Sequence, residues 1–198
     1  MLETTTDIWT YGRYFKIITE PIVEPITVEE VKDFARIDGN DEDAMIETFV
    51  VTARHAAELY TGRAFISQSV RLVLDEWNLR ALDLPMPPLI SVTNVQTVDE
   101  DDSTTDFDSA KYYVVTESIP GKVVIKNDYA LPSNDVRTSG GYRVNYIAGY
   151  GTTPSSVPRA IRTALLLWVT EIYEKRDLAG EPSPDVKKLL YDFRVRNL

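Results

Sequence analysis

The chain has 198 residues, of which 43% are hydrophobic, enough apolar material for one folded core or two small ones. Its 31 acidic and 21 basic residues give a formal net charge of −10, so nucleic-acid phosphates should repel it and sequence-specific nucleic-acid binding is not expected. The absence of cysteine excludes disulfides and thiolate metal sites, and no run predicts a signal peptide or a membrane span.

A strand and a helix are predicted near the start of the chain. The run IWTYGRYFKII alternates aromatic and β-branched residues, which predicts an extended segment that the following prolines end. Thr27 and Glu30 have the spacing of a capping box, and Ile26 and Val31 have that of a hydrophobic staple. We therefore expect a first helix that begins at Thr27 and ends near Gly39.

A second helix is predicted directly after the first. Asp41 can cap its start and Gly62 can end it. Its apolar residues recur at helical spacing and form one stripe that should face a core: Ile46, Phe49, Val50, Ala53, Ala57 and Tyr60. At about 100° per residue, His55 lies roughly opposite Ile46, so it should face away from that core.

From about residue 66 the period of the apolar residues changes from 3.6 to 2. Short alternating runs, separated by turn-forming residues, predict antiparallel strands and hairpins: SVRLVLDEW, ISVTNVQTV, KYYVVTE, GKVVIK and YRVNYIAG. An antiparallel sheet or a small barrel is therefore expected. Three prolines, Pro85, Pro87 and Pro88, indicate an edge strand and a turn rather than a polyproline ligand.

The acidic run DEDDSTTDFD, residues 99–108, raises the question of a calcium loop. Such a loop needs a glycine at its sixth position and a glutamate at its twelfth. Counted from Asp99, those positions hold Thr104 and Ala110. The run is therefore predicted to be the solvated tip of a hairpin.

A long helix is predicted in the run VPRAIRTALLLWVTEIYEKR. One face carries Ile161, Ala164, Leu165, Trp168 and Ile172. Four further apolar residues lie outside this stripe: Leu166, Leu167, Val169 and Tyr173. So wide an apolar arc indicates a helix that is central in its domain or is partly covered by a partner.

The connection YIAGYGTTPSSVPRAI, which precedes this helix, resembles a phosphate-binding turn only in part. Gly149 and Gly151 occupy two glycine positions of the G-x-G-x-x-G pattern, but the third falls on Pro154. The glycines instead predict positive φ angles or close backbone approach, and Pro158 predicts the start of the helix.

No catalytic residue, cofactor or metal site is assigned from the sequence. His55 is the only histidine, so one chain cannot form a multi-histidine metal site. The nucleophile elbow G-x-S-x-G and the zinc motif H-E-x-x-H are both absent. The sequence therefore does not indicate an enzyme.

Taken together in their order and spacing, these motifs resemble one protein family. The similarity covers roughly residues 24–178 and runs through the opening two-helix unit, LDLPMPPLISVTNVQTVD, DFDSAKYYVV and GKVVIK to YRVNYIAGYGTTPSSVPRAIRTALLLWVTEIYEKRD. Its most specific part is the block A-G-Y-G…V-P…I-R…A. The chain resembles the head-tail connector, or adaptor, proteins of long-tailed bacteriophages and of gene transfer agents.

The resemblance implies an α+β fold, a helical bundle elaborated by an inserted antiparallel β-sheet of hairpins. We expect a single adaptor domain over residues 1–198, with a helical pair at 24–64, a β-rich insertion at 66–150 and C-terminal helices at 156–198. It also implies a structural protein that binds beneath the portal ring, extends the DNA channel and carries the next tail-side neck protein. DNA would pass without sequence-specific binding, no membrane would be involved, and the particle would assemble in the bacterial cytoplasm.

The resemblance further implies a ring of copies that matches the portal; a dodecamer is the expected form, while the sequence itself does not give the copy number. The subunit interface would involve Val51, His55, Leu166, Leu167, Val169 and Tyr173. The C-terminal segment SPDVKKLLYDFRVRNL leaves two interpretations open: a terminal helix folded on its own core, or a docking helix for a groove on the portal. The docking residues would be Val186, Lys187, Lys188, Leu189, Leu190, Phe193, Arg194 and Arg196.

Two other functions compete with the connector. A small carboxylate-dependent hydrolase could use Asp75 and Glu76, although neighbours on a strand point to opposite faces. A β-rich carbohydrate or cell-surface binding module could use Trp9, Tyr11 and Trp77 as stacking platforms. The helices at both ends of the chain disfavour the binding module, and the missing catalytic motifs disfavour the hydrolase.

Overall fold

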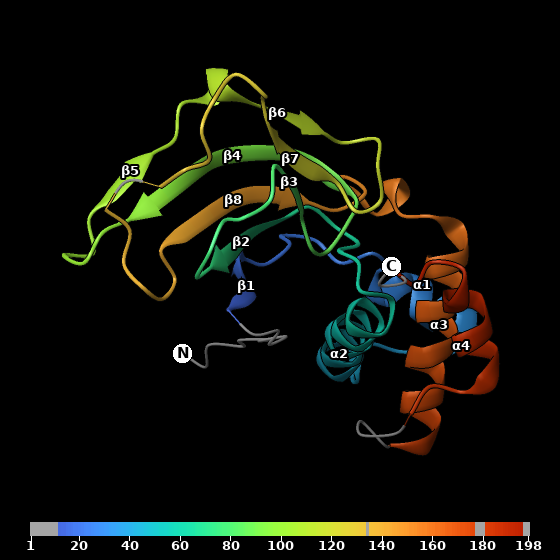
Figure 1. Ribbon diagram of the computed structural model, residues 1–198. Coiled ribbons are helices and arrows are strands. Elements are labelled where there is room, and N and C mark those ends of the chain that lie inside the picture. The colour runs from blue at the N-terminus through green and yellow to red at the C-terminus, as the bar shows by residue number, and fades with distance from the viewer. Residues whose placement is uncertain (1–11, 134, 177–180, 196–198) are drawn as a thin grey trace. The chain divides into compact units, whose positions relative to one another are not determined.

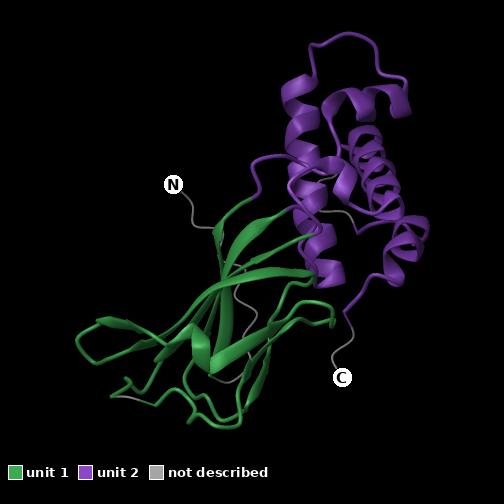
Figure 2. Cartoon of the chain, turned by 90° about the horizontal axis from the view of Figure 1, so that it is seen from above, with its two compact units in different colours: residues 1–20, 67–149 green, residues 21–66, 150–198 purple. Residues whose placement is uncertain are grey.

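The computed structural model describes residues 12–133, 135–176 and 181–195. The chain forms two compact units: residues 1–20 with 67–149, and residues 21–66 with 150–198 (Figure 2). The first unit contains the strands and the second contains the α-helices. The helical unit is thus assembled from two stretches that are separated in sequence by most of the sheet unit, and the expected α+β class is confirmed.

The sheet unit holds a five-stranded and a three-stranded sheet, and every pair of neighbouring strands is antiparallel (Figure 1). The large sheet has the order β1 (Arg13–Thr19), β2 (Gln68–Leu74), β8 (Tyr142–Ala148), β4 (Leu89–Val98) and β5 (Thr104–Asp106). The small sheet has the order β3 (Ala81–Asp83), β7 (Lys122–Ile125) and β6 (Tyr112–Val115). Each alternating run of the sequence therefore contributes a strand.

Strand β8 lies in the middle of the large sheet, and its two faces differ. Val144, Tyr146 and Ala148 are buried, as the period of 2 requires. On the other face, Asn145 Oδ1 accepts a hydrogen bond from Arg71 Nε at 2.7 Å, and Asn145 Nδ2 donates to Asn94 Oδ1 at 2.7 Å. One face of the sheet thus packs in a core, while the other carries a polar ladder across neighbouring strands.

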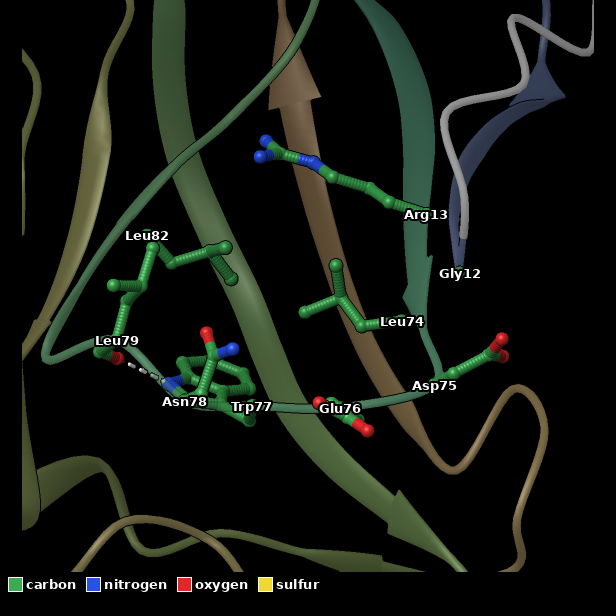
Figure 3. Close-up of a pocket in the computed structure, with 9 residues that line it drawn as sticks. All are labelled: Gly12, Arg13, Leu74, Asp75, Glu76, Trp77, Asn78, Leu79 and Leu82. Carbon is green, nitrogen blue, oxygen red and sulfur yellow. Dashed lines mark hydrogen bonds between the residues drawn. The ribbon is translucent and has the colours of Figure 1, made fainter.

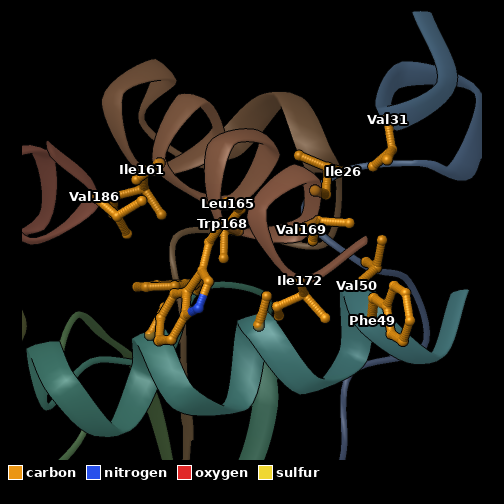
Figure 4. Close-up of a cluster of buried hydrophobic side chains, with 14 of the residues drawn as sticks. Ile26, Val31, Phe49, Val50, Ile161, Leu165, Trp168, Val169, Ile172 and Val186 are labelled. Carbon is orange, nitrogen blue, oxygen red and sulfur yellow. The ribbon is translucent and has the colours of Figure 1, made fainter. Parts of the chain in front are cut away.

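The helical unit consists of α1 (Val28–Ala35), α2 (Asp43–Thr61), α3 (Arg159–Lys175) and α4 (Pro184–Tyr191), with a short 3₁₀ turn, η2 (Pro154–Ser156), before α3. Helix α3 contacts all three other helices. Its Leu165 and Trp168 side chains point toward α2 in the shared apolar core (Figure 4). The central position of α3 explains the fully buried part of its wide apolar arc, while Leu166 and Leu167 stay half-buried.

The boundaries of the first two helices differ from the prediction by a few residues. The capping box is confirmed, because Thr27 Oγ1 accepts from the Glu30 N–H at 3.2 Å and Glu30 Oε2 accepts from the Thr27 N–H at 3.0 Å. Helix α1, however, already ends at Arg36, whose left-handed backbone lets its N–H bond the Lys32 carbonyl. At the start of helix α2, Glu42 rather than Asp41 holds the N-cap position, without a capping hydrogen bond from its side chain, and the helix ends at Gly62 as predicted.

Candidate functional site

The glycines before α3 form a turn between a strand and a helix. Gly149 has φ 136° and Gly151 has φ 156°, so both take the positive φ that the sequence predicted. An added Cβ at Gly151 would lie 2.5 Å from Ser156 Oγ. The Tyr150 N–H donates to the Phe65 carbonyl at 3.0 Å. The positive φ angles and the close contact at Gly151 explain why these positions hold glycine. A phosphate ligand is not needed to explain them.

The helical unit buries an ion-pair network that we did not predict from the sequence. The Arg54 side chain is only 1% exposed; its Nε donates to Glu24 Oε2 at 2.7 Å and its Nη1 donates to Glu58 Oε2 at 3.0 Å. Glu58 Oε1 also accepts from the Phe65 N–H at 2.7 Å. Burial raises the pKa of Glu58 to about 7, although the nearby Arg54 and the Phe65 N–H act in the opposite direction.

This network ties three stretches of the helical unit together. Glu24 precedes α1, Arg54 and Glu58 lie one helical turn apart on α2, and Phe65 follows α2. Within the residues that the structure describes, no group of three or more His, Cys, Asp or Glu side chains could hold a metal ion. The hydrogen bonds of the network hold these three stretches together. The four-residue spacing of Arg54 and Glu58 beside the apolar stripe was the available sequence signal.

The predicted interface residues lie in different environments. Val51 and His55 are half-buried on α2, while Leu166 and Leu167 are half-buried on α3 at the edge of the core. Val169 is fully buried inside the unit's own core. It therefore has no surface to offer to a second copy, and we withdraw it from the interface set.

Tyr173 is engaged within its own helical unit. Its hydroxyl donates to Glu42 Oε2, and Arg176 Nη2 donates to Glu42 Oε1 at 2.8 Å. The hydrogen bonds from Tyr173 and Arg176 lower the pKa of Glu42. The cluster joins the end of α3 to the start of α2, so Tyr173 has a structural task in the single chain.

The C-terminal segment folds onto its own unit. Ser183 caps α4 by accepting from the Val186 N–H at 3.4 Å, and Val186 and Leu190 are 0% exposed in the helical core. A groove on a portal cannot receive these two side chains while α4 keeps this position. Leu189 and Phe193 are half-buried against the same core.

The basic residues of the same segment remain accessible. Lys188 and Arg194 are exposed, and the Arg194 guanidinium lies 5.0 Å from the centre of the Tyr60 ring. Lys187 is half-buried and its Nζ lies 2.5 Å from Glu181 Oε2. Arg196 lies outside the described residues. The structure thus separates an apolar stripe that is in use from basic groups that face solvent.

The sheet unit has a hollow of about 390 Å³ that involves the residues of both competing functions (Figure 3). Trp77 is 6% exposed and its Nε1–H donates to the Leu79 carbonyl at 2.8 Å, so it presents no open ring for stacking. Asp75 Oδ1 accepts from Ser139 Oγ at 3.0 Å and from the Gly140 N–H at 2.7 Å. Asp75 thus fixes a loop, and Trp9 and Tyr11 lie outside the described residues.

The acidic run after β4 forms a solvated turn, as predicted. Asp99 Oδ1 accepts from the Asp101 N–H at 3.0 Å and from the Ser103 N–H at 2.8 Å. The turn joins β4 to β5, and most of its side chains are exposed.

None of the described helices is long and apolar enough to cross a bilayer.

Residues 24–182 match the protein family described as head completion protein. A solved chain from the neck of an empty GTA particle, computed with C6 symmetry, is similar at 27% identity and a TM-score of 0.79, with 93% of this chain and 97% of that chain covered. A chain from the virion of a native gene transfer agent (GTA) particle matches at 26% identity and a TM-score of 0.78, with the same coverage.

A third chain comes from the neck of a native GTA particle computed with C12 symmetry. It matches at 25% identity and a TM-score of 0.73, with 92% of this chain and 97% of that chain covered. No curated protein matches the chain. Together, the family match and the structural matches confirm the resemblance that the sequence motifs indicated.

Proposed function

The chain belongs to the head completion protein family and is a structural head-tail connector, and we propose that it binds beneath the portal ring of a phage-like particle. There it extends the DNA channel and carries the next tail-side neck protein. The whole-chain structural match to the neck of a gene transfer agent particle is the observation that carries this proposal. All 198 residues then act as one adaptor, which assembles in the bacterial cytoplasm and stays in the virion neck.

Copies of the chain are proposed to form a closed ring of twelve around the channel. The necks that it resembles have been computed with C6 and C12 symmetry. A ring lets many modest contacts act together, because each copy is held by two neighbours and by the portal. We therefore expect a weakly associating monomer in isolation and a ring on the portal.

The charge of the chain supports a channel through which DNA passes without being bound tightly. The formal net charge is −10, and four consecutive carboxylates, residues 99–102, lie in the turn between β4 and β5. Such charge repels phosphates and lets a duplex slide through without sequence-specific binding.

Contact with the portal is proposed to involve the accessible basic groups of the C-terminal segment. Lys188 and Arg194 are exposed on the segment whose apolar side is already used in the core. Exposed charges of this kind steer association and are sensitive to salt. Lys188→Glu should weaken portal binding while the thermal midpoint of the chain stays unchanged.

The experiment that tests the function combines the purified chain with the portal protein of its own particle. Light scattering and electron microscopy should detect a ring of copies on the portal, and particles made without the chain should be heads that lack tails. A chain that never joins the portal, or particles that gain tails in its absence, would contradict the proposal. The Lys188→Glu variant, which should bind the portal more weakly, shows whether that binding depends on the basic groups of the C-terminal segment.

A further inference from the structure

Helix α2 has an outward face without Asp, Glu, Lys or Arg over about three turns. Starting one residue after Glu47, this α2 face consists of Thr48, Val51, Thr52, His55 and Leu59. Leu59 is 58% exposed, while the charged residues Arg54 and Glu58 of the same stretch are buried. The solvent side of a helix normally carries charged and polar residues, so such a face is typical of a helix that another protein covers.

The threonines of the α2 face have their hydroxyl groups already bonded. Thr48 Oγ1 donates to the Ala44 carbonyl at 3.0 Å, and Thr52 Oγ1 donates to the Thr48 carbonyl at 2.8 Å. Each hydroxyl thus satisfies its donor inside the helix and leaves its methyl group at the surface. When another protein covers this face, few polar groups lose water without having another hydrogen-bond partner. The cost of desolvation is therefore small.

Helix α3 has a second face of the same kind. Between Arg159 and Glu174, this α3 face consists of Thr163, Leu166, Leu167 and Thr170. Thr170 Oγ1 donates to the Leu166 carbonyl at 2.8 Å, so its donor is also satisfied inside the helix. Residues 159, 163, 166 and 170 follow the spacing of four and three that forms a seam between packed helices.

We propose that the α2 face of one copy packs against the α3 face of the next copy in the ring, an inference that rests on the proposed connector function. A cyclic ring with more than two copies needs two different, complementary surfaces on each copy. The helical unit has two such faces, and each combines exposed with half-buried side chains in the isolated chain. A second copy of this chain is therefore the occupant of each face.

The charges at the ends of the two faces select the direction of packing. Glu47 precedes the α2 face and Arg159 precedes the α3 face; both are exposed, and neither has an ion-pair partner among the described residues. Parallel helices bring Glu47 to Arg159, whereas antiparallel helices bring Glu47 to Glu174 and place like charges together. The two helices therefore run parallel. Val51 then lies opposite Thr163, because Val51 is four residues after Glu47 and Thr163 is four residues after Arg159.

Cysteine cross-linking tests this register, because the chain has no cysteine of its own. The paired variant Val51→Cys with Thr163→Cys should form disulfides between copies when rings assemble on the portal, and should give a ladder of covalent oligomers. The matched variant Leu59→Cys with Thr163→Cys, which would cross-link only in the antiparallel arrangement, should stay monomeric under denaturing conditions. The reverse pattern, or no ladder from assembled rings, would overturn the inference.

Charge reversal gives an independent test in the same assay. Glu47→Arg and Arg159→Glu should each raise the concentration needed for ring assembly by roughly tenfold, and the double variant should restore it. Glu29→Arg, at an exposed position on α1 outside both faces, is the control and should have no effect. A double variant as weak as the single ones would contradict the pairing.

The two assays also separate the interface from the function. If the unmodified chain forms no ring on the portal, the connector function fails and the inference fails with it. If rings form but neither the cross-links nor the restored double variant is found, only the α2–α3 contact is wrong. Thermal midpoints of the variants, compared with that of the unmodified chain, show that each variant is folded.

Discussion

The helical unit and the sheet unit place their charges in opposite ways. Both are acidic, with 16 acidic and 12 basic residues in the helical unit and 15 and 9 in the sheet unit. The helical unit nevertheless buries Arg54 and Glu58 and leaves the α2 and α3 faces without charge. The sheet unit instead exposes its acidic turn and carries a half-buried polar ladder. The two units therefore differ in where their charges lie rather than in how many charges they have, and the proposed α2–α3 contact rests on this difference.

The largest expected effect comes from removing the buried cation of the helical unit. Arg54→Met leaves Glu24 and Glu58 without their partner, and we expect a loss of about 3–5 kcal/mol in the free energy of unfolding at pH 8. Arg71→Met, in the polar ladder of the sheet unit, is the matched control and should cost only about 1 kcal/mol. Urea denaturation followed by circular dichroism measures both. Equal losses would remove the contrast between the two units.

A somewhat smaller effect is expected from the apolar side of α4. Leu190 is 0% exposed, so Leu190→Ala should lower the free energy of unfolding by about 2–5 kcal/mol through lost burial and a cavity. Lys188→Ala, on the exposed side of the same helix, should change it by less than about 0.5 kcal/mol. If Leu190→Ala left stability intact but abolished portal binding, α4 would be a docking helix and its position in the core would be wrong.

The elements of the fold show what a sequence pattern can and cannot predict. The capping box, the apolar stripe of α2 and the alternating strands depend on neighbours close in sequence, and the structure contains each of them. The stripe of Val186 and Leu190 predicted a covered face but not which chain covers it. An amphipathic helix has the same spacing whether it packs at home or on a partner.

The same limit applied to the features that depend on distant residues. Arg54 is buried because Glu24 and Glu58 both reach it, and its helical position alone does not reveal that Glu24 lies beside it. Val169 lay outside the apolar stripe of α3 in the sequence, yet α3 is surrounded by three helices and its core face is wider. Burial in a central helix is set by how many neighbours it has.

The turn between β8 and α3 should be sensitive to a side chain in a moderate way. Gly149 has φ 136°, which L residues rarely adopt, so Gly149→Val should cost about 1–3 kcal/mol of stability. Because the turn is a connection rather than a phosphate site, ATP, NAD and phosphate should not raise the thermal midpoint. Differential scanning fluorimetry measures both effects, and a reproducible rise with a nucleotide would contradict this interpretation.

An effect of similar size is expected from pH, because the stability of the chain should depend on the protonation of Glu58. Its pKa is raised to about 7 in the folded chain, against an ordinary value of 4.5, so between these values the folded chain holds a proton that the unfolded chain has released. The stabilisation is complete below pH 4.5 and is lost as the pH rises through 7. From pH 5 to 7.5 the chain should lose about 2 kcal/mol more than Glu58→Gln, which is the loss that a pKa shift from 4.5 to about 7 implies.

Urea denaturation at the two pH values measures that difference. A Glu58→Gln variant with the same pH slope as the unmodified chain would show that Glu58 does not titrate in this range. A slope of the opposite sign would show that the ion pair with Arg54 outweighs burial. Either result would mean that burial does not determine the pKa of Glu58. The contrast between the buried network and the solvated charges of the sheet unit would then be weaker.

The most direct measurement of the central claim is an electron cryomicroscopy map of the neck of a particle that contains this chain. We expect a ring of twelve copies directly beneath the portal, with α2 of each copy parallel to α3 of its neighbour. A ring without that helix contact would refute the interface alone. Density for this chain anywhere other than the neck would contradict the connector function itself.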